Sequence, residues 1–185
     1  GPFGNQIKIK LIEVDQVNAN ERIGTYGFIK KAPSYLVSIC KNNQENLLDL
    51  GFVFENFILF LEVKNISTCW VGGTFHRNKL QKMQTLLEDE FIPIISPVGY
   101  AAEKPGLFNK FIRKMAQSDR RLHFDSLFFQ NDFLHPIRES STRELLKYVR
   151  LAPSASNKQP WRILMDENQM AHFYIERTPK YGNAL

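Results

Sequence analysis

The apolar segment from Asn46 to Lys64 constrains the fold more than any other part of this sequence. Its large side chains recur at intervals of three and four residues, which is the spacing of one helix face: Leu47, Leu50, Phe54, Phe57, Ile58 and Leu61. The remaining faces also carry apolar side chains: Leu48, Phe52, Val53 and Leu59. We therefore expect a long helix that is buried nearly all round. The acidic residues within it make the segment too polar for a membrane span.

Three shorter segments carry the signals of β-strands. Apolar and polar residues alternate over residues 7–12, as in a half-buried strand. The run over residues 35–40 is β-branched and mostly apolar, and the run over residues 92–100 is apolar and punctuated by prolines. We expect a strand in each of the three.

The last third of the chain predicts a helix followed by a hairpin. Ser141 and Glu144 form a capping box, which indicates the start of a helix. Four side chains of this helix are expected to point inward: Leu145, Leu146, Tyr148 and Val149. Residues 161–165 and 172–176 then predict two strands joined by a turn.

The composition is that of an ordinary globular protein. The 185 residues are 43% hydrophobic and 23% charged, and this length fits one domain or two small joined halves. Cys40 and Cys69 show no CxxC or His–Cys spacing, so we expect neither a disulfide nor a metal site. Unpaired cysteines fit a reducing cytoplasm.

The net charge of +5 is concentrated in one segment. Between Lys104 and Arg121 there are six basic residues and one acid, so the rest of the chain is neutral overall. Such a cluster can hold a phosphate, a nucleic acid or an acidic lipid surface, and it can equally be a solvated helix face. Its aromatic residues are Phe108 and Phe111 alone, with no recognisable module around them, so we expect no nucleic-acid partner.

The segment from Ala152 to Trp161 has the composition of a loop that can meet a flat ring. Its small residues allow a backbone to approach closely, and Asn157 and Gln159 supply both donors and acceptors. Pro153 ends the preceding helix and Pro160 stiffens the exit. A flavin ring needs such polar contacts along its edge. The same composition also fits a plain connection between two elements.

The order of residues in this loop closely resembles the flavin-edge motif of the nitroreductase family. It is Ala-Pro-Ser-Ala-Ser-Asn-x-Gln-Pro-Trp-Arg, from Ala152 to Arg162. Other segments resemble the branch of that family in which one chain carries two halves that imitate a homodimer: Pro2–Gly4, Gly24–Lys30, Asp49–Glu55, Thr68–Phe75 and Pro97–Tyr100. The resemblance extends over almost the whole chain.

This resemblance implies an α+β fold with a mostly antiparallel sheet and long central helices. It also implies two pseudo-symmetric halves, residues 1–135 and 136–185, with FMN between them. The implied activity passes a hydride from NAD(P)H through the flavin to a nitroaromatic, quinone or similar small-molecule acceptor. An alternative is a flavin-binding or sensing module without efficient turnover. The implied protein is cytoplasmic, with no membrane partner, and is a pseudo-dimeric monomer or a homodimer.

The resemblance also assigns residues to the flavin. Five would line the isoalloxazine ring from the second half: Pro153, Ser154, Ala155, Ser156 and Asn157. Gly72 and Gly73 would lie beside the ring in the first half, where a Cβ would crowd the cofactor. Arg120 and Arg121 would lie near the phosphate. Two other basic residues offer the same chemistry: Arg113 and Lys114. No side chain is assigned as a catalytic acid, base or nucleophile.

Neighbouring residues have supporting or structural roles in this interpretation. Gln159 and Trp161 would hold the loop rather than contact the flavin. Trp70 would either shape the substrate pocket or belong to the core, and Glu55 would take part in a structural pair. His172, in a predicted strand, would be structural.

Two features of the family pattern are expected outside this sequence. An Arg-Arg-Ser-type arm that clasps the flavin phosphate would precede Gly1, and the second half would continue past Leu185 with a further helix. The arm would add one or two charge-assisted contacts to the phosphate, each worth ~1.5–3 kcal/mol. We therefore expect the 185-residue chain alone to bind FMN weakly or not at all.

Overall fold

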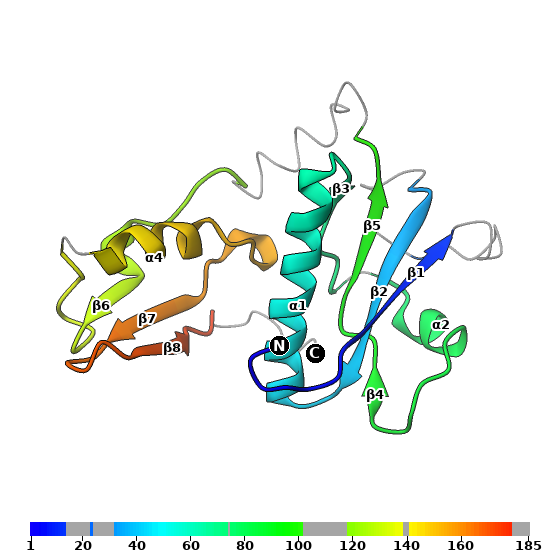
Figure 1. The fold of residues 1–185 in the computed structure, drawn as a ribbon, viewed down its shortest axis with the longest axis horizontal. Helices are drawn as coiled ribbons and strands as arrows, with labels where there is room; N and C mark the ends of the chain where they lie inside the picture. The colour runs from blue at the N-terminus through cyan, green and yellow to red at the C-terminus, as the bar shows by residue number, and fades with distance from the viewer. Residues whose placement is uncertain (14–22, 24–31, 74, 102–117, 139–140, 179–185) are drawn as a thin grey trace. The chain divides into compact units, whose positions relative to one another are not determined.

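The computed structural model describes residues 1–13, 23, 32–73, 75–101, 118–138 and 141–178. The chain divides into two units, Gly1–Lys104 and Pro105–Asn183, each with helices and strands of its own (Figure 1). The expected α+β fold with mostly antiparallel strands is confirmed, because one strand pair alone among those described is parallel. The unit boundary lies earlier than residue 135, and the assignment of two pseudo-symmetric halves stays a prediction.

The first unit is built on an antiparallel sheet in the order β1-β2-β5-β3, with β4 paired to β2. Its strands are β1 (Lys8–Glu13), β2 (Ser34–Lys41), β3 (Ser67–Thr68), β4 (Glu90–Phe91) and β5 (Ile95–Gly99). The three strands predicted from the sequence correspond to β1, β2 and β5. Two short strands, β3 and β4, carry too few residues for a periodic pattern.

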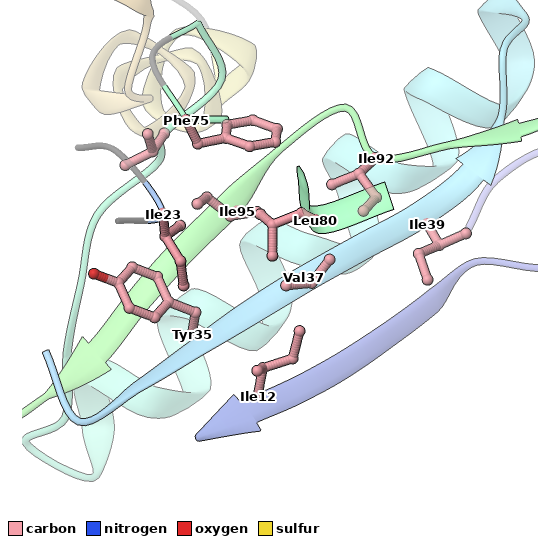
Figure 2. Packing of buried hydrophobic residues seen from close by; sticks show 10 residues of the cluster. Ile12, Ile23, Tyr35, Val37, Ile39, Phe75, Leu80, Ile92 and Ile95 are labelled. Atoms are coloured by element: carbon pink, nitrogen blue, oxygen red, sulfur yellow. The ribbon is translucent and has the colours of Figure 1, made fainter. Parts of the chain in front are cut away.

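Strand β2 is buried on both faces because each face serves a separate core. Tyr35, Val37 and Ile39 point into a cluster that also receives Ile95 from β5 and Leu80 from helix α2 (Arg77–Lys82) (Figure 2). The alternate side chains of β2 point the other way, into a second cluster formed with helix α1. The sheet therefore has a packed layer on each side of its central strand.

Helix α1 (Gln44–Val63) covers the second face of the sheet. It begins at Asn43, whose side-chain oxygen accepts a hydrogen bond from the amide of Asn46 at 2.9 Å. The expectation of burial all round is wrong. Leu50, Phe54 and Leu61 face the sheet, whereas six apolar side chains are exposed: Leu48, Phe52, Phe57, Leu59, Phe60 and Val63. One sheet face can cover only one side of a helix.

The second unit has a three-stranded sheet in the order β6-β7-β8. Its elements are η2 (Phe124–Ser126), β6 (Phe128–Gln130), α4 (Ser141–Leu151), η3 (Ala155–Asn157), β7 (Trp161–Met165) and β8 (Ala171–Ile175). β6 pairs with β7 in parallel, and β7 with β8 antiparallel, which confirms the predicted hairpin. The core contains Phe124, Phe128, Leu146 and Ile163.

Helix α4 packs on this core by a narrower face than the sequence predicts. Leu146 is buried and Val149 packs partly against the core, but Leu145 and Tyr148 are exposed. Residues 145 and 148 are neighbours on the helix surface, one position away from 146 and 149, so they share a different face. The side chain of Ser141, and with it the capping box, lies outside the described residues.

A search of the described helices for a membrane span finds no candidate of sufficient length and hydropathy.

A buried carboxylate attaches the first turn of the chain to helix α1. The side chain of Asp49 is fully buried and accepts hydrogen bonds from the backbone amides of Phe3 at 2.8 Å and Asn5 at 2.7 Å. The side-chain amide of Asn5 donates a third at 3.0 Å. Burial alone would raise the pKa of Asp49, but these hydrogen bonds outweigh burial and lower the pKa.

Asp49 should therefore make the stability of the fold depend on pH. A carboxyl group whose pKa is lower in the folded state stabilises the fold above its unfolded pKa, about 3.9, and this contribution is lost as the pH falls through the folded pKa. We expect Asp49→Asn to melt at a lower temperature than the wild type at neutral pH. Its melting temperature should also fall less than that of the wild type as the pH is lowered. Thermal unfolding at a series of pH values measures this, and parallel curves for the two proteins would contradict it.

The two sides of helix α1 should respond differently to truncation. Phe54 is fully buried, so Phe54→Ala should lower the free energy of unfolding by about 3–5 kcal/mol through lost burial and the remaining cavity. Phe60 is 54% exposed, so Phe60→Ala should change it by no more than about 0.5 kcal/mol. Urea unfolding of both variants tests the assignment, and equal losses would show that the exposed side is packed in solution.

Candidate functional site

The loop between α4 and β7 adopts a strained backbone conformation. Ser156, Asn157 and Gln159 have φ angles of 49°, 52° and 49°, in the left-handed region. For a residue with a side chain this region costs roughly 1–2 kcal/mol, and asparagine tolerates it better than serine or glutamine. Such a conformation persists only where its surroundings enforce it, and it is characteristic of binding and active sites.

Gln159 is the residue that enforces this conformation. Its side chain is 2% exposed, and its Oε1 accepts a hydrogen bond from the amide of Leu122 at 2.9 Å. Its Nε2 donates to the carbonyls of Arg120 at 3.3 Å and Asn157 at 3.2 Å. The backbone amide of Gln159 donates to the hydroxyl of Ser154 at 2.9 Å. These contacts fit the supporting role expected for Gln159, and the expectation that it does not contact the flavin stays a prediction.

The structure brings Arg120 and Arg121 to the same loop. The side-chain amide of Asn157 donates to the carbonyl of Arg120 at 2.8 Å, and Nη1 of Arg121 donates to Oδ1 of Asn157 at 3.4 Å. Arg121 also donates to the carbonyls of Ser118 at 2.8 Å and Leu151 at 3.1 Å. These contacts join the segment before Leu122 to the end of α4 and to the loop.

The positive charge of Arg121 is not balanced by an acid within the described residues. No described carboxylate lies within ion-pair distance of its guanidinium. Its Nε is buried and has no hydrogen-bond partner among the described residues. Carbonyl dipoles solvate the guanidinium, but they leave its net charge in place. Arg121 therefore places a positive charge beside the loop, which is a charge that can attract an anion. Arg113 and Lys114, the other basic residues considered for a phosphate, lie outside the described residues.

Gly72 and Gly73 belong to the first unit, where they lead from β3 towards helix α2 (Arg77–Lys82). Among the described residues, a Cβ placed on Gly73 would meet no atom within 4 Å, and one on Gly72 would meet Ile94 Cδ1 at 3.8 Å and nothing nearer. Neither glycine has a φ angle in the left-handed region. The fold by itself therefore tolerates a side chain at either position, and the space beside Gly73 is open.

Trp70, next to this glycine loop, takes part in the core. Its Nε1 donates to Oε2 of Glu55 at 2.9 Å, and its ring meets Phe54 edge-on with centroids 4.9 Å apart. These contacts confirm the structural pair expected for Glu55. They favour the core role for Trp70 over a role in a substrate pocket.

Two arginines that hold the loops were not predicted from the sequence. Arg77 donates to the carbonyl of Gly72 at 3.0 Å, and Arg150 donates from Nε to the carbonyl of Leu122 at 2.7 Å. An arginine that binds main-chain carbonyls has no spacing signal, because its partners can be any residue type. The nearness of Arg77 to the two glycines is the one available signal.

The histidines and cysteines form no catalytic or metal-binding group in the described part of the chain. His172 lies in β8, and its Nε2 is 2.9 Å from Oδ2 of Asp166. The other oxygen of that carboxylate, Oδ1, accepts a hydrogen bond from the backbone amide of Met170 in the hairpin turn. Cys40 and Cys69 are both free. Among the residues that the structure describes, no cluster of His, Cys, Asp and Glu could hold a metal ion. The structural role expected for His172 fits its contact with Asp166.

The sequence matches the profile of one protein family over residues 3–181, and that family is described as "Putative TM nitroreductase". A search of curated proteins gives no significant match.

Solved structures of similar fold come from the same family. A protein of Thermotoga maritima described as a putative nitroreductase has 20% identity and a TM-score of 0.50, with 88% of this chain and 55% of that chain covered. This chain thus spans about half the length of the Thermotoga protein. A nitroreductase family protein of Clostridium novyi NT has 16% identity and a TM-score of 0.44, with 54% and 63% covered. The first likeness shows a shared fold, and the second is too low to support an argument.

Replacing Gln159 should destabilise the second unit by loosening the loop. Gln159→Ala leaves the Leu122 amide without its acceptor, and the free energy of unfolding should fall by about 1–3 kcal/mol. Gln169 is a matched control because it also has a left-handed φ, 62°, but is exposed in the hairpin turn. Gln169→Ala should change stability by about 0.5 kcal/mol or less. Equal effects in urea unfolding would mean that the side-chain contacts of Gln159 contribute nothing.

Proposed function

The chain belongs to the nitroreductase family matched over residues 3–181, and on this premise we propose that it is an FMN-dependent oxidoreductase. It would take a hydride from NAD(P)H and pass the electrons to a nitroaromatic, quinone or similar small acceptor. The bound flavin supplies the redox chemistry, because its ring accepts and returns a hydride. The protein then has to bind, orient and shield the reacting groups, and no catalytic acid or base is assigned.

The conformation of residues 153–159 is the observation that carries this proposal. Three left-handed residues with side chains lie within four positions, and a buried glutamine and a guanidinium hold them. A plain connection between a helix and a strand needs no such strain. The family motif falls on this same loop, so the strain and the motif independently indicate a binding role.

The residues present fit the two chemical parts of FMN. Residues Pro153 to Asn157 would line the isoalloxazine ring, since most of their side chains are small. The side-chain amide of Asn157 lies beside the positively charged guanidinium of Arg121, which donates to its Oδ1. That charge, with Arg120, would favour the flavin phosphate. Gly72 and Gly73 would border the ring in the first unit, where a Cβ would meet a bound ring rather than the protein.

Arg120 and Arg121 would act on the phosphate mainly through their charge. Most of the Arg121 donors are already engaged with carbonyl groups, which fixes the guanidinium in place. A fixed cation in a partly buried position attracts an anion without having to lose side-chain freedom on binding. This preorganisation suits a cofactor that is retained between reaction cycles.

The proposal includes the cell compartment and the assembly. Two free cysteines are compatible with a reducing cytoplasm. The exposed apolar side of α1 supports an assembly in which this helix is covered, as a pseudo-dimeric monomer or as a homodimer. Light scattering coupled to size-exclusion chromatography distinguishes the two forms.

Gly73→Ala is the sharpest test of the proposed flavin site. Because a Cβ at Gly73 meets no atom of the described residues within 4 Å, the variant should fold with an unchanged melting temperature but bind added FMN roughly tenfold more weakly. Gly51→Ala, in helix α1, is the control, since its Cβ also meets nothing within 4 Å. Flavin fluorescence during titration with FMN measures both affinities.

Activity is tested with the same protein in excess FMN. NADPH should bleach the visible flavin band, and a quinone or nitroaromatic should sustain NADPH oxidation. Flavin binding without NADPH oxidation would instead support a binding or sensing module. Equal FMN binding by Gly73→Ala and the wild type would overturn the proposal.

A further inference from the structure

The glycine loop of the first unit is joined to its surroundings by one arginine side chain. Nη2 of Arg77 donates to the carbonyl of Gly72 at 3.0 Å, and Nε donates to the carbonyl of Ile92 at 2.9 Å. A longer contact from Nη2 reaches the carbonyl of Pro93 at 3.4 Å. The guanidinium carbon also lies 5.1 Å from the centre of the Phe75 ring. The Arg77 side chain thus contacts Gly72 and Phe75 of the loop, and also the segment that leads into β5.

The two ends of this loop are fixed by other means. Val71 exchanges two backbone hydrogen bonds with Ile95, at 2.9 Å and 3.0 Å. Phe75 is buried in the first core, and α2 begins two residues later. Between these points, no atom of the described residues lies within 4 Å of the position that a Cβ on Gly73 would take. The link from Gly72 to Arg77 is therefore the described contact that ties the interior of the loop to the fold.

The contacts of Arg77 do not resemble those of a surface ion pair. Within the described residues its side chain contacts three carbonyls and an aromatic ring, and no carboxylate lies at ion-pair distance. Ile92 is fully buried, so its carbonyl depends on a protein donor. The planar fork of a guanidinium can donate in two directions at once, which a lysine ammonium on a flexible stem does poorly.

We propose that Arg77 is the positioning residue of the Gly72–Gly73 loop and holds it in the conformation that receives the flavin ring. This inference rests on the proposed function, which places that loop beside the flavin. Arg77 itself need not touch the cofactor. It acts through the Gly72 carbonyl, and its effect on bound flavin follows from the placement of the loop.

The first measurement does not depend on any cofactor. Hydrogen exchange at the amides of Gly72, Gly73 and Phe75 should be faster in Arg77→Met and in Arg77→Lys than in the wild type. Lys82→Met removes an exposed cation from the same helix and should leave exchange at the loop unchanged. Unchanged exchange in both Arg77 variants would overturn the inference, whether or not the chain binds FMN.

The second measurement separates positioning from general stability. At saturating FMN, the Arg77 variants should shift the absorption maximum and the midpoint potential of the bound flavin, and raise the Kd for FMN roughly tenfold. Arg143→Met is the matched control, since Arg143 donates to the carbonyl of Ile137 at 2.6 Å and lies 3.9 Å from the ring centre of Phe124. It should lower the melting temperature without changing the flavin spectrum.

The outcomes distinguish this inference from the proposed function. If exchange at the loop accelerates while the flavin spectrum, potential and Kd stay those of the wild type, the positioning role is wrong although the flavin site stands. If the wild type binds FMN but NADPH does not reduce the bound flavin, the proposed oxidoreductase function is wrong, and the exchange, spectral and Kd data still decide whether Arg77 holds the loop. If Arg143→Met alters the flavin spectrum as the Arg77 variants do, the effect is general and the inference fails.

Discussion

The burial of strand β2 on both faces is the constraint on which the first unit depends. Alternate side chains of β2 serve two separate cores, so a shift of register by one residue would exchange them. The register continues outward, because Val37 pairs with Ile95 and Ile95 in turn exchanges hydrogen bonds with Val71. The glycine loop begins directly after Val71. The position of that loop is thus set by the central strand, through two consecutive backbone pairings.

Guanidinium groups that donate to main-chain carbonyls fix both candidate loops. Arg77 does so beside Gly72 and Arg121 does so beside Asn157. A carbonyl solvates a cation without cancelling its charge, whereas a carboxylate would form a neutral pair. This arrangement gives a loop both rigidity and a positive field. These two properties suit the binding of a planar cofactor that carries a phosphate group.

The positions of the longer helices and strands could be predicted from periodicity, but which face of each helix is buried could not. Strands β1, β2 and β5, helices α1 and α4 and the final hairpin all lie where alternation or helical spacing predicts them. The degree of burial was overestimated for α1 and for Leu145 and Tyr148 of α4. Apolar residues occupied every face of α1, and composition cannot say which of them meet the sheet. That choice depends on the orientation of the helix, which is set by residues distant in sequence, such as Leu36 and Cys40.

The sequence by itself determined the type of the longer elements, the family and the identity of the loop that carries the flavin motif, because these are recorded in local order. The tertiary structure decided how that loop is held. The left-handed conformation at Ser156 and Gln159, and the contacts of Gln159 with Leu122 and Arg120, join residues more than thirty positions apart. Hydrogen bonds to main-chain carbonyls and amides do not depend on the identity of the partner residue. These hydrogen bonds therefore could not be predicted from the pattern of residues along the chain.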